Sequence, residues 1–494
     1  MSYLKNNKIL EELRPFFYPE SIAVVGVSQD PTKLGSAMLR ALRKFGFRGK
    51  IYPVGQRITE LYGLPVFPSI SAIPEKVDLV RIYISAQHVL NVVQECRDKA
   101  IPAVEIFTGG FKETGTEEGE KLEGALASMA GKGLRIIGPN SFGVYAPETG
   151  IPHLDYASYP QDSGNLGLIA QSGTISEDVC RLAQDYGFRF SKVVGYGNAC
   201  DINETDLLKY LEADPLTNLI AVYMEGPKKG REFFEILQRL SRKKPVIIWK
   251  GGLTPEGARA AASHTASIAG NENIWNAVYQ QTLAVRVDSL EELVDTITAF
   301  YHLAPIVDNR ISVVCSGGGT SVAATDTCSR EGLVIPKFGN ELRQKIATLL
   351  PPIGTSIGNP IDVGTPYFPP AEILHEMLGY VASSGVVGSI VIDKVVVSAK
   401  LRKLLGYGEQ MNWEDTQWLE EIPVQVAKDH GVSVVMILRE GGDKTGDLSY
   451  ETEKRRLRKY YQDNGVLVYP TIGRALRALG RVISYYRRKQ ALGE

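Results

Sequence analysis

The chain has 494 residues, 44% of them apolar and 22% charged, which is too long for one hydrophobic core and predicts two to four domains. Lysine and arginine number 55 against 56 for aspartate and glutamate, a balance that argues against a protein that recruits nucleic acid or an anionic membrane surface. Five scattered cysteines without a Cys-x-x-Cys pair argue against disulfides and structural zinc, and the N-terminus lacks the apolar run of a signal peptide, so we expect a cytoplasmic protein with no metal in this chain.

Residues 1–20 are expected to form an N-terminal extension, and residues 21–147 the first α/β domain. The apolar strand SIAVVGV begins at Ser21, and a loop that ends at Gly35 leads into an amphipathic helix. Further strands at KIYPV, DLVRIYIS, AVEIFTGG and LRIIGPN alternate with amphipathic stretches. This order is typical of a parallel sheet with helices on its faces.

Two further α/β domains are predicted over residues 148–305 and 306–494. A linker rich in Pro, Tyr, Asp and Gly leads to the strands LGLIA, SKVVGYG, NLIAVYMEG and PVIIWKGG, and the third domain contributes RISVVCSGGG, VVGSIVID, VSVVMILREGG and VLVYP. The segment LIAQSGTISEDVCRLAQDYGF can be aligned with VVCSGGGTSVAATDTCSREGL. We therefore expect two similar doubly wound units, with ligand sites at the carboxyl ends of their strands.

The first strand-to-helix loop, GVSQDPTKLG, could hold a phosphate group. Gly26 follows the strand and Gly35 opens the helix, so backbone amides and the helix dipole can face an anion, and Lys33 adds a positive charge. The loops at Gly55–Arg57 and Thr108–Phe111 should meet it at the same sheet edge. The spacing is not GxGxxG, which disfavours NAD. A tight turn without a ligand, and a solvated Arg57, remain alternatives.

A second candidate phosphate site lies in the second domain. Gln171, Ser172, Gly173 and Thr174 stand between a buried strand and an amphipathic helix, where they offer hydroxyls and free amide groups. A plain helix cap is the alternative explanation. The similar run Ser316–Thr320 in the third domain shows that this motif by itself does not decide between the two.

His264 is the candidate catalytic histidine. It lies in GARAAASHTASIAG, a run of small residues typical of a loop that moves. A neutral imidazole is a nucleophile near neutral pH and can accept a phosphoryl group. Glu225, at the end of the strand LIAVYMEG, could bind this imidazole and stabilise positive charge on it. Taken singly, the histidine would ordinarily be a surface or core-edge residue, and the glutamate a surface residue at a strand end.

Seven segments in this order resemble the NDP-forming acyl-CoA synthetases, the superfamily that contains succinyl-CoA synthetase and ADP-forming acetyl-CoA synthetase. They are SIAVVGVSQDPTKLG, GFRGKIYPVG, GPNSFGVYAP, GNLGLIAQSGTISED, VVGYGNACDINETDLLKYL, YMEGPKKGREF and SHTASIAG. The resemblance covers nearly the whole chain. It implies an alpha-type subunit with a Rossmann-like CoA-binding domain followed by two flavodoxin-like, succinyl-CoA synthetase-like domains.

The resemblance also implies roles for single residues. It places the following residues in the CoA site: Gly26, Ser28, Lys33, Gly35, Arg57, Thr108, Gly109, Gly110 and Phe111. It makes His264 the phosphohistidine, Glu225 the residue that holds it, and Ser172, Gly173 and Thr174 the helix end that faces the phosphate. Gly55, Gln56 and Arg57 stand where Asn, Pro and Lys are usual in the family, which leaves their contact with CoA open.

The reaction that the resemblance implies needs a partner. Acyl-CoA and phosphate yield acyl phosphate, the histidine takes the phosphoryl group and releases the acid, and the loop then phosphorylates ADP. The last step requires an ATP-grasp domain, and the three predicted domains use all 494 residues. We expect a separate ATP-grasp, beta-type subunit that binds ADP or ATP with Mg²⁺, in a hetero-oligomer with, for example, two copies of each subunit.

Two other functions agree less well with the sequence. A non-catalytic CoA-binding or acyl-CoA-binding protein that has lost its ATP-grasp partner is disfavoured because both His264 and Glu225 are present. An NAD-linked dehydrogenase is disfavoured because GxGxxG is absent and because the second and third domains would have no role in it.

Overall fold

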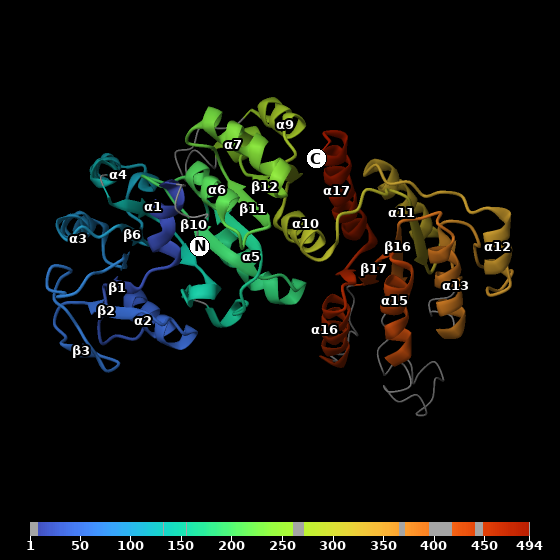
Figure 1. Ribbon diagram of the computed structural model, residues 1–494, viewed down its shortest axis with the longest axis horizontal. Helices are drawn as coiled ribbons and strands as arrows, with labels where there is room; N and C mark the ends of the chain where they lie inside the picture. The colour runs from blue at the N-terminus through green and yellow to red at the C-terminus, as the bar shows by residue number, and fades with distance from the viewer. Residues whose placement is uncertain are drawn as a thin grey trace. The chain divides into compact units, whose positions relative to one another are not determined.

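The computed structural model describes residues 8–131, 133–154, 156–259, 271–364, 371–394, 417–439 and 448–493. The chain divides into two compact units. The first contains Met1–Gln184 and Phe188–Leu293, and the second contains Asp185–Gly187 and Val294–Glu494. Among the described residues, the first unit holds two large sheets and the second unit holds one (Figure 1). The predicted α/β class is confirmed.

The first sheet has the strand order β2-β1-β5-β6-β7, and all of its pairs are parallel. Its elements are β1 (Ser21–Val25), α2 (Leu34–Phe45), β2 (Lys50–Val54), β5 (Leu79–Ile82), α3 (Ala86–Asp98), β6 (Ala103–Ile106), α4 (Glu117–Met129) and β7 (Arg135–Ile137). Successive β1 residues point to opposite faces: Ile22 packs in the core that contains α2, whereas Ala23 packs in the core that contains α3 and α4. A short hairpin, β3 (Glu60–Leu61) with β4 (Leu64–Pro65), follows β2.

The second sheet has the order β13-β12-β11-β9-β10-β8, parallel except where β8 pairs antiparallel with β10. Its elements are β8 (Gly143–Tyr145), β9 (Leu166–Ala170), α5 (Gly173–Tyr186), β10 (Phe190–Gly195), α6 (Glu204–Ala213), β11 (Leu219–Met224), α7 (Gly230–Lys243), β12 (Val246–Lys250), α9 (Glu272–Gln281), β13 (Val285–Val287) and α10 (Leu290–His302). Strand β8 lies within the residues assigned to the first predicted domain but extends the second sheet.

The third sheet, in the second unit, has the order β15-β14-β16-β17-β18 and is entirely parallel. Its elements are β14 (Ile311–Cys315), α11 (Gly318–Arg330), α12 (Asn340–Ala347), β15 (Ile361–Asp362), α13 (Ala371–Ser383), β16 (Ser389–Lys394), α15 (Gln417–His430), β17 (Ser433–Leu438), α16 (Leu448–Asp463), β18 (Leu467–Tyr469) and α17 (Ile472–Ala491). Helices α12, α13 and α15 pack in sequence, and α11 packs with α17. None of the described helices is long and apolar enough to cross a membrane.

All three sheets share one topology. When the antiparallel β8 is set aside, the parallel strands of each sheet are ordered second, first, third, fourth, fifth along the chain. This is a doubly wound order, and ligands bind such sheets where the order reverses, at the carboxyl ends of the first and third strands. The corresponding strand pairs are β1 with β5, β9 with β11, and β14 with β16.

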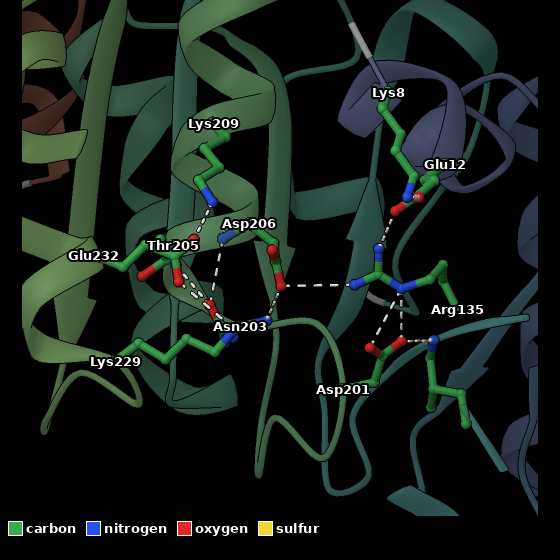
Figure 2. Close-up of polar contacts among 11 residues, drawn as sticks. Lys8, Glu12, Arg135, Asp201, Asn203, Thr205, Asp206, Lys209, Lys229 and Glu232 are labelled. Atoms are coloured by element: carbon green, nitrogen blue, oxygen red, sulfur yellow. Dashed lines mark hydrogen bonds and ion pairs between the residues drawn. The ribbon is translucent and has the colours of Figure 1, made fainter. Parts of the chain in front are cut away.

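The N-terminal extension contains a helix, α1 (Lys8–Phe17), that sequence reasoning did not identify. Its apolar residues are buried, and Arg135 at the start of β7 fixes its polar side (Figure 2). The Arg135 guanidinium lies 2.6 Å from a Glu12 carboxylate oxygen and 2.9 Å from one of Asp201, which follows β10. One arginine thus connects the helix to both sheets of the first unit.

A buried ion pair joins the first sheet to β8. Arg81 on β5 and Glu105 on β6 approach to 2.7 Å, and each side chain is 1% exposed. Arg81 also donates to the backbone carbonyl of Pro152 at 3.0 Å. A Cβ atom on Gly143 would lie 1.8 Å from a Glu105 oxygen, so glycine is required where β8 passes the ion pair.

Candidate active site

Glu225 lies where the strand order of the second sheet reverses. It follows β11, and its backbone N–H donates to Gln171 Oε1, just after β9, at 2.8 Å. The backbone N–H of Gln171 in turn donates to the carbonyl of Tyr223 at 3.0 Å, and the Tyr223 hydroxyl donates to Glu225 Oε1 at 3.4 Å. Gln171 is 6% exposed and Glu225 7% exposed. These contacts hold the Glu225 carboxylate at the carboxyl edge of the sheet.

The N-terminus of α5 adjoins Glu225 through Gln171. Ser172 caps this helix: its Oγ accepts the backbone N–H of Ile175 at 3.4 Å, and its carbonyl accepts the backbone N–H of Ser176 at 3.2 Å. Gly173 and Thr174 begin the helix, so their amide groups have no acceptor within it. Capping and anion binding are therefore compatible here, because they use different groups.

The similar helix end in the third sheet differs from this one. The backbone N–H of Gly317, just before α11, donates to Asp362 Oδ1 at 2.8 Å, and the same oxygen accepts from Gly364 at 2.9 Å. Asp393 at this edge pairs with Arg439. A carboxylate of the protein thus already uses an amide at the start of α11. This contrast favours α5 over α11 as the phosphate site.

His264 lies outside the described residues, which stop at residue 259 and resume at residue 271. The segment that contains it connects β12 to α9, so it leaves the sheet from the strand beside β11. Its predicted role as phosphohistidine remains a prediction.

In the first sheet, two glycines allow the strand-to-helix loop to close tightly. Gly26 has a φ of +101°, and a Cβ atom there would lie 2.6 Å from the Tyr83 carbonyl oxygen. A Cβ on Gly35 would lie 2.5 Å from the Gly26 carbonyl oxygen. Ser28 is held by Ser36, whose Oγ accepts the Ser28 amide at 3.0 Å and donates to the Ser28 carbonyl at 2.7 Å. The loop backbone is therefore preformed.

Two cations stand near this preformed loop. Lys33 is the residue before α2, and Arg57 follows β2, the strand beside β1. Both are exposed, and neither side chain donates a hydrogen bond to another described residue. Arg57 has a φ of 70°. Exposed cations beside a glycine-lined loop fit the diphosphate of a nucleotide such as CoA.

The loop after β6 is closed by its own glutamate. Glu113 Oε1 accepts the amides of Gly110 at 2.5 Å and Phe111 at 3.2 Å, and Thr108 Oγ1 donates to the Ile84 carbonyl at 2.6 Å. The Gly110 amide, predicted for the CoA site, is therefore already bonded within the loop. The contribution of this loop to the CoA site remains a prediction.

Sequence reasoning missed the residue that anchors Glu113. Asn198, after β10, donates from Nδ2 to Glu113 Oε2 and, at 2.8 Å, to Glu123 Oε2. Burial works against ionisation of Glu113, but the hydrogen bonds from Asn198 and the loop amides hold the pKa of this carboxyl below its ordinary value. The asparagine thereby ties the loop of the first sheet to the second sheet. Its sequence context, GYGNACD, carried no signal of this contact.

A cavity of about 380 Å³ lies on the helices of the first unit. It is lined by Lys8, Ile9, Glu12, Lys209, Glu212 and Arg239. Arg239 lies 2.6 Å from a Glu212 oxygen. Lys209 forms an ion pair with Glu232 (Figure 2). Its lining residues come from α1, α6 and α7 and none from a strand end, so it is distinct from the sites above.

Comparison with known proteins assigns both domains of the first unit. Residues 20–147 match the family model of a CoA binding domain, and residues 163–300 match that of a succinyl-CoA ligase like flavodoxin domain. The alpha subunit of ADP-forming acetate–CoA ligase I from Pyrococcus furiosus is 38% identical over 359 residues, which are 71% of this chain and 76% of that protein.

Two further relatives cover almost the whole chain. ADP-forming acetate–CoA ligase II of Archaeoglobus fulgidus is 32% identical over 487 residues, which are 97% of this chain and 68% of that protein. The structure of acetyl-coenzyme A synthetase 1 from Candidatus Korarchaeum cryptofilum, in complex with phosphate and ADP, superposes with a TM-score of 0.80 at 30% identity and covers 97% of each chain. Since one family accounts for nearly every residue, the chain belongs to the NDP-forming acyl-CoA synthetases, which are acid–thiol ligases.

Proposed function

We propose that this chain is the CoA-binding, alpha-type subunit of an ADP-forming acyl-CoA synthetase. The complete enzyme interconverts acyl-CoA, phosphate and ADP with a carboxylic acid, CoA and ATP. The observation that carries the proposal is the hydrogen bond between the Glu225 amide and Gln171, which holds a buried carboxylate at the sheet edge where α5 begins with the open amides of Gly173 and Thr174. That arrangement suits a histidine that receives a phosphoryl group.

In the first step, a phosphate oxygen attacks the acyl carbonyl carbon, the C–S bond breaks, and CoA leaves as a thiolate that takes up a proton. The product is an acyl phosphate. Lys33 and Arg57, exposed and without a hydrogen-bond acceptor among the described residues, would hold the diphosphate of CoA. The amides of Gly173 and Thr174 would stabilise negative charge on the phosphate oxygens.

In the second step, a ring nitrogen of His264 attacks phosphorus, and the carboxylate of the acid leaves. Glu225 would accept a hydrogen bond from the other ring nitrogen, which fixes the tautomer and stabilises the charge that develops on the ring. In the third step, a terminal phosphate oxygen of ADP attacks the phosphohistidine, which regenerates the imidazole and yields ATP.

The third step is assigned to an ATP-grasp, beta-type subunit that binds ADP or ATP with Mg²⁺. The Pyrococcus furiosus relative is named an alpha subunit, and the Archaeoglobus fulgidus relative is longer than this chain, which spans 68% of it. Both facts support further domains beyond those described here. We place the enzyme in the cytoplasm, as a hetero-oligomer of alpha-type and beta-type subunits.

Transfer of labelled phosphate tests the proposal. The chain is incubated with a panel of acyl-CoAs, labelled inorganic phosphate and the candidate ATP-grasp subunit, and acid-labile label is mapped by peptide. Label is expected on His264. The variant His264→Asn should form no ATP while it binds CoA with unchanged affinity. Labelling elsewhere, or no labelling while ATP is formed, would refute the proposal.

A further inference from the structure

Lys250 lies next to the proposed phosphate site, on the strand beside Glu225. It is the last residue of β12, and its partner in the parallel register is Met224, the last residue of β11. Neighbouring strands are about 4.8 Å apart, and a lysine side chain extends about 6 Å, so its ammonium can reach the edge that Glu225 and Gln171 share. Sequence reasoning did not single out this lysine.

The ammonium of Lys250 is buried and incompletely bonded. The residue is 3% exposed. An ammonium has three N–H donors, yet within the described part of the chain Nζ donates only to the Gly251 carbonyl and lies 5.7 Å from the centre of the Trp275 ring. Lys192, in the same sheet, has a side chain that is only 1% exposed, but its Nζ lies 2.9 Å from an Asp214 oxygen. A buried cation without such an ion pair is costly for the fold.

The electrostatics of Lys250 agree with this geometry. Burial lowers the pKa of the ammonium to about 8, and the negative charge of Glu225 opposes that decrease. The protonated form thus predominates at neutral pH but gains little stabilisation from the protein. Its unused donors are available to an acceptor that carries negative charge, which would also stabilise the protonated form.

We propose that Lys250 is an anion-binding residue that donates hydrogen bonds to the phosphate group held between Glu225 and the start of α5. The role in turnover rests on the proposed function, whereas the binding of free phosphate can be tested on this chain alone. Phosphate fits because Lys250 ends β12 and the open amides of Gly173 and Thr174 follow β9, on either side of β11 at the carboxyl edge of one sheet, and charged oxygens of one group can accept from both.

Titration of the full chain with inorganic phosphate provides the test. Lys250→Met removes the charge at similar length and should weaken phosphate binding about 10- to 100-fold, the range for a charge-assisted hydrogen bond. Lys250→Arg keeps the charge and should bind phosphate within a few-fold of the parent. CoA affinity should be unchanged in both variants, because the predicted CoA residues lie on the first sheet.

Lys244 provides the matched control. It stands before β12, is partly buried, and donates to the carbonyls of Leu211 at 2.7 Å and Asp214 at 2.8 Å. Lys244→Met should lower resistance to urea and leave phosphate affinity unchanged. Lys250→Met should show the opposite pattern, with weaker phosphate binding and stability at pH 7 equal to or above that of the parent.

Two results would overturn the inference: unchanged phosphate affinity in Lys250→Met, or no phosphate binding by the parent chain. Kinetic measurements with the ATP-grasp subunit then distinguish a failure of this inference from a failure of the proposed function. If the parent forms phosphohistidine and Lys250→Met has an unchanged KM for phosphate, only the inference fails. If phosphate binding depends on Lys250 but no histidine is labelled, only the proposed function fails.

Discussion

His153 shows at the level of one residue how burial determines protonation. Its ring stacks on Phe142 with centroids 3.7 Å apart, and the Tyr159 hydroxyl lies 3.3 Å from its Nδ1. Burial, together with the charges of Arg81 and Arg181, lowers the pKa of this imidazole to about 3. The ring is therefore neutral in the folded protein at every pH near neutrality.

This shift predicts a loss of stability in mild acid. The folded pKa lies below the ordinary value of about 6.5, so between these values the unfolded chain binds more protons and stability falls as pH falls. The contribution of the neutral His153 ring to the free energy of unfolding is fully present above pH 6.5. When the pH is lowered from 7 to 4, the free energy of unfolding should fall by about 3 kcal/mol less in His153→Phe than in the parent protein. Urea unfolding of both proteins across this range checks it, and parallel pH profiles would contradict it.

The buried pair of Arg81 and Glu105 predicts a non-additive effect. Arg81→Met leaves the Glu105 carboxylate buried without its partner, and we expect a loss of about 3 to 5 kcal/mol in the free energy of unfolding. The double variant Arg81→Met/Glu105→Met removes both charges and should recover most of this loss. Denaturant unfolding of the single and double variants measures the coupling, and equal stability of the two variants would refute the prediction.

At the level of elements, helix N-termini differ in what completes them. Helix α6 begins with a capping box: Asn203 Oδ1 accepts the amides of Thr205 at 2.9 Å and Asp206 at 3.3 Å, and the Asp206 side chain accepts the Asn203 amide at 3.4 Å. At α11 an aspartate accepts from the amide of Gly317, the residue before the helix, whereas at α5 the corresponding edge holds Glu225 and Gln171. The open end is the one suited to bind a ligand.

The capping box predicts a graded effect. Asn203→Ala removes the acceptor for two amides and should lower the free energy of unfolding by about 1 kcal/mol, whereas Asn203→Gly should lower it by only a few tenths. Urea unfolding with a far-ultraviolet circular dichroism signal resolves the two variants. A larger loss in the glycine variant would indicate that backbone freedom, and not capping, dominates at this position.

At the level of the whole molecule, the predicted CoA residues all lie in the first of two compact units. A ligand stabilises the unit that binds it, by about 2.7 kcal/mol at a concentration of 100 times Kd. Calorimetry should therefore show that CoA raises the Tm of one unfolding transition and leaves the transition of the second unit unchanged.

A second variant locates this effect on the CoA site. Arg57→Ser should reduce the CoA-induced increase in Tm, because its exposed guanidinium has no hydrogen-bond acceptor among the described residues and should contribute little to the stability of the free protein. The same increase in Arg57→Ser as in the parent would place Arg57 outside the CoA site.

How far the sequence predicts structure varied between elements. Apolar runs located the central strands closely: KIYPV became β2, and SIAVV became β1. The helix α1, with Pro15 inside it, and the short antiparallel β8 were missed. Strand β8, with three residues, is too short for a periodic pattern to identify, whereas α1 has an amphipathic spacing at Leu10, Leu13 and Phe17 but contains Pro15, which argues against a helix. Both are held by distant partners such as Arg135 and the strand β10.

The sequence by itself determined the α/β class, the family, and the position of Glu225 at a strand end, because apolar periodicity and ordered motifs are local properties of a chain. Only the tertiary structure decided which of two similar helix ends is open, since Asp362 reaches Gly317 across 45 residues. It also brought Lys250 beside Glu225, because the register of the parallel strands β11 and β12 pairs Lys250 with Met224, the residue before Glu225. Burial of that lysine, which no sequence pattern specifies, leaves donors of its ammonium available for the anion that we propose.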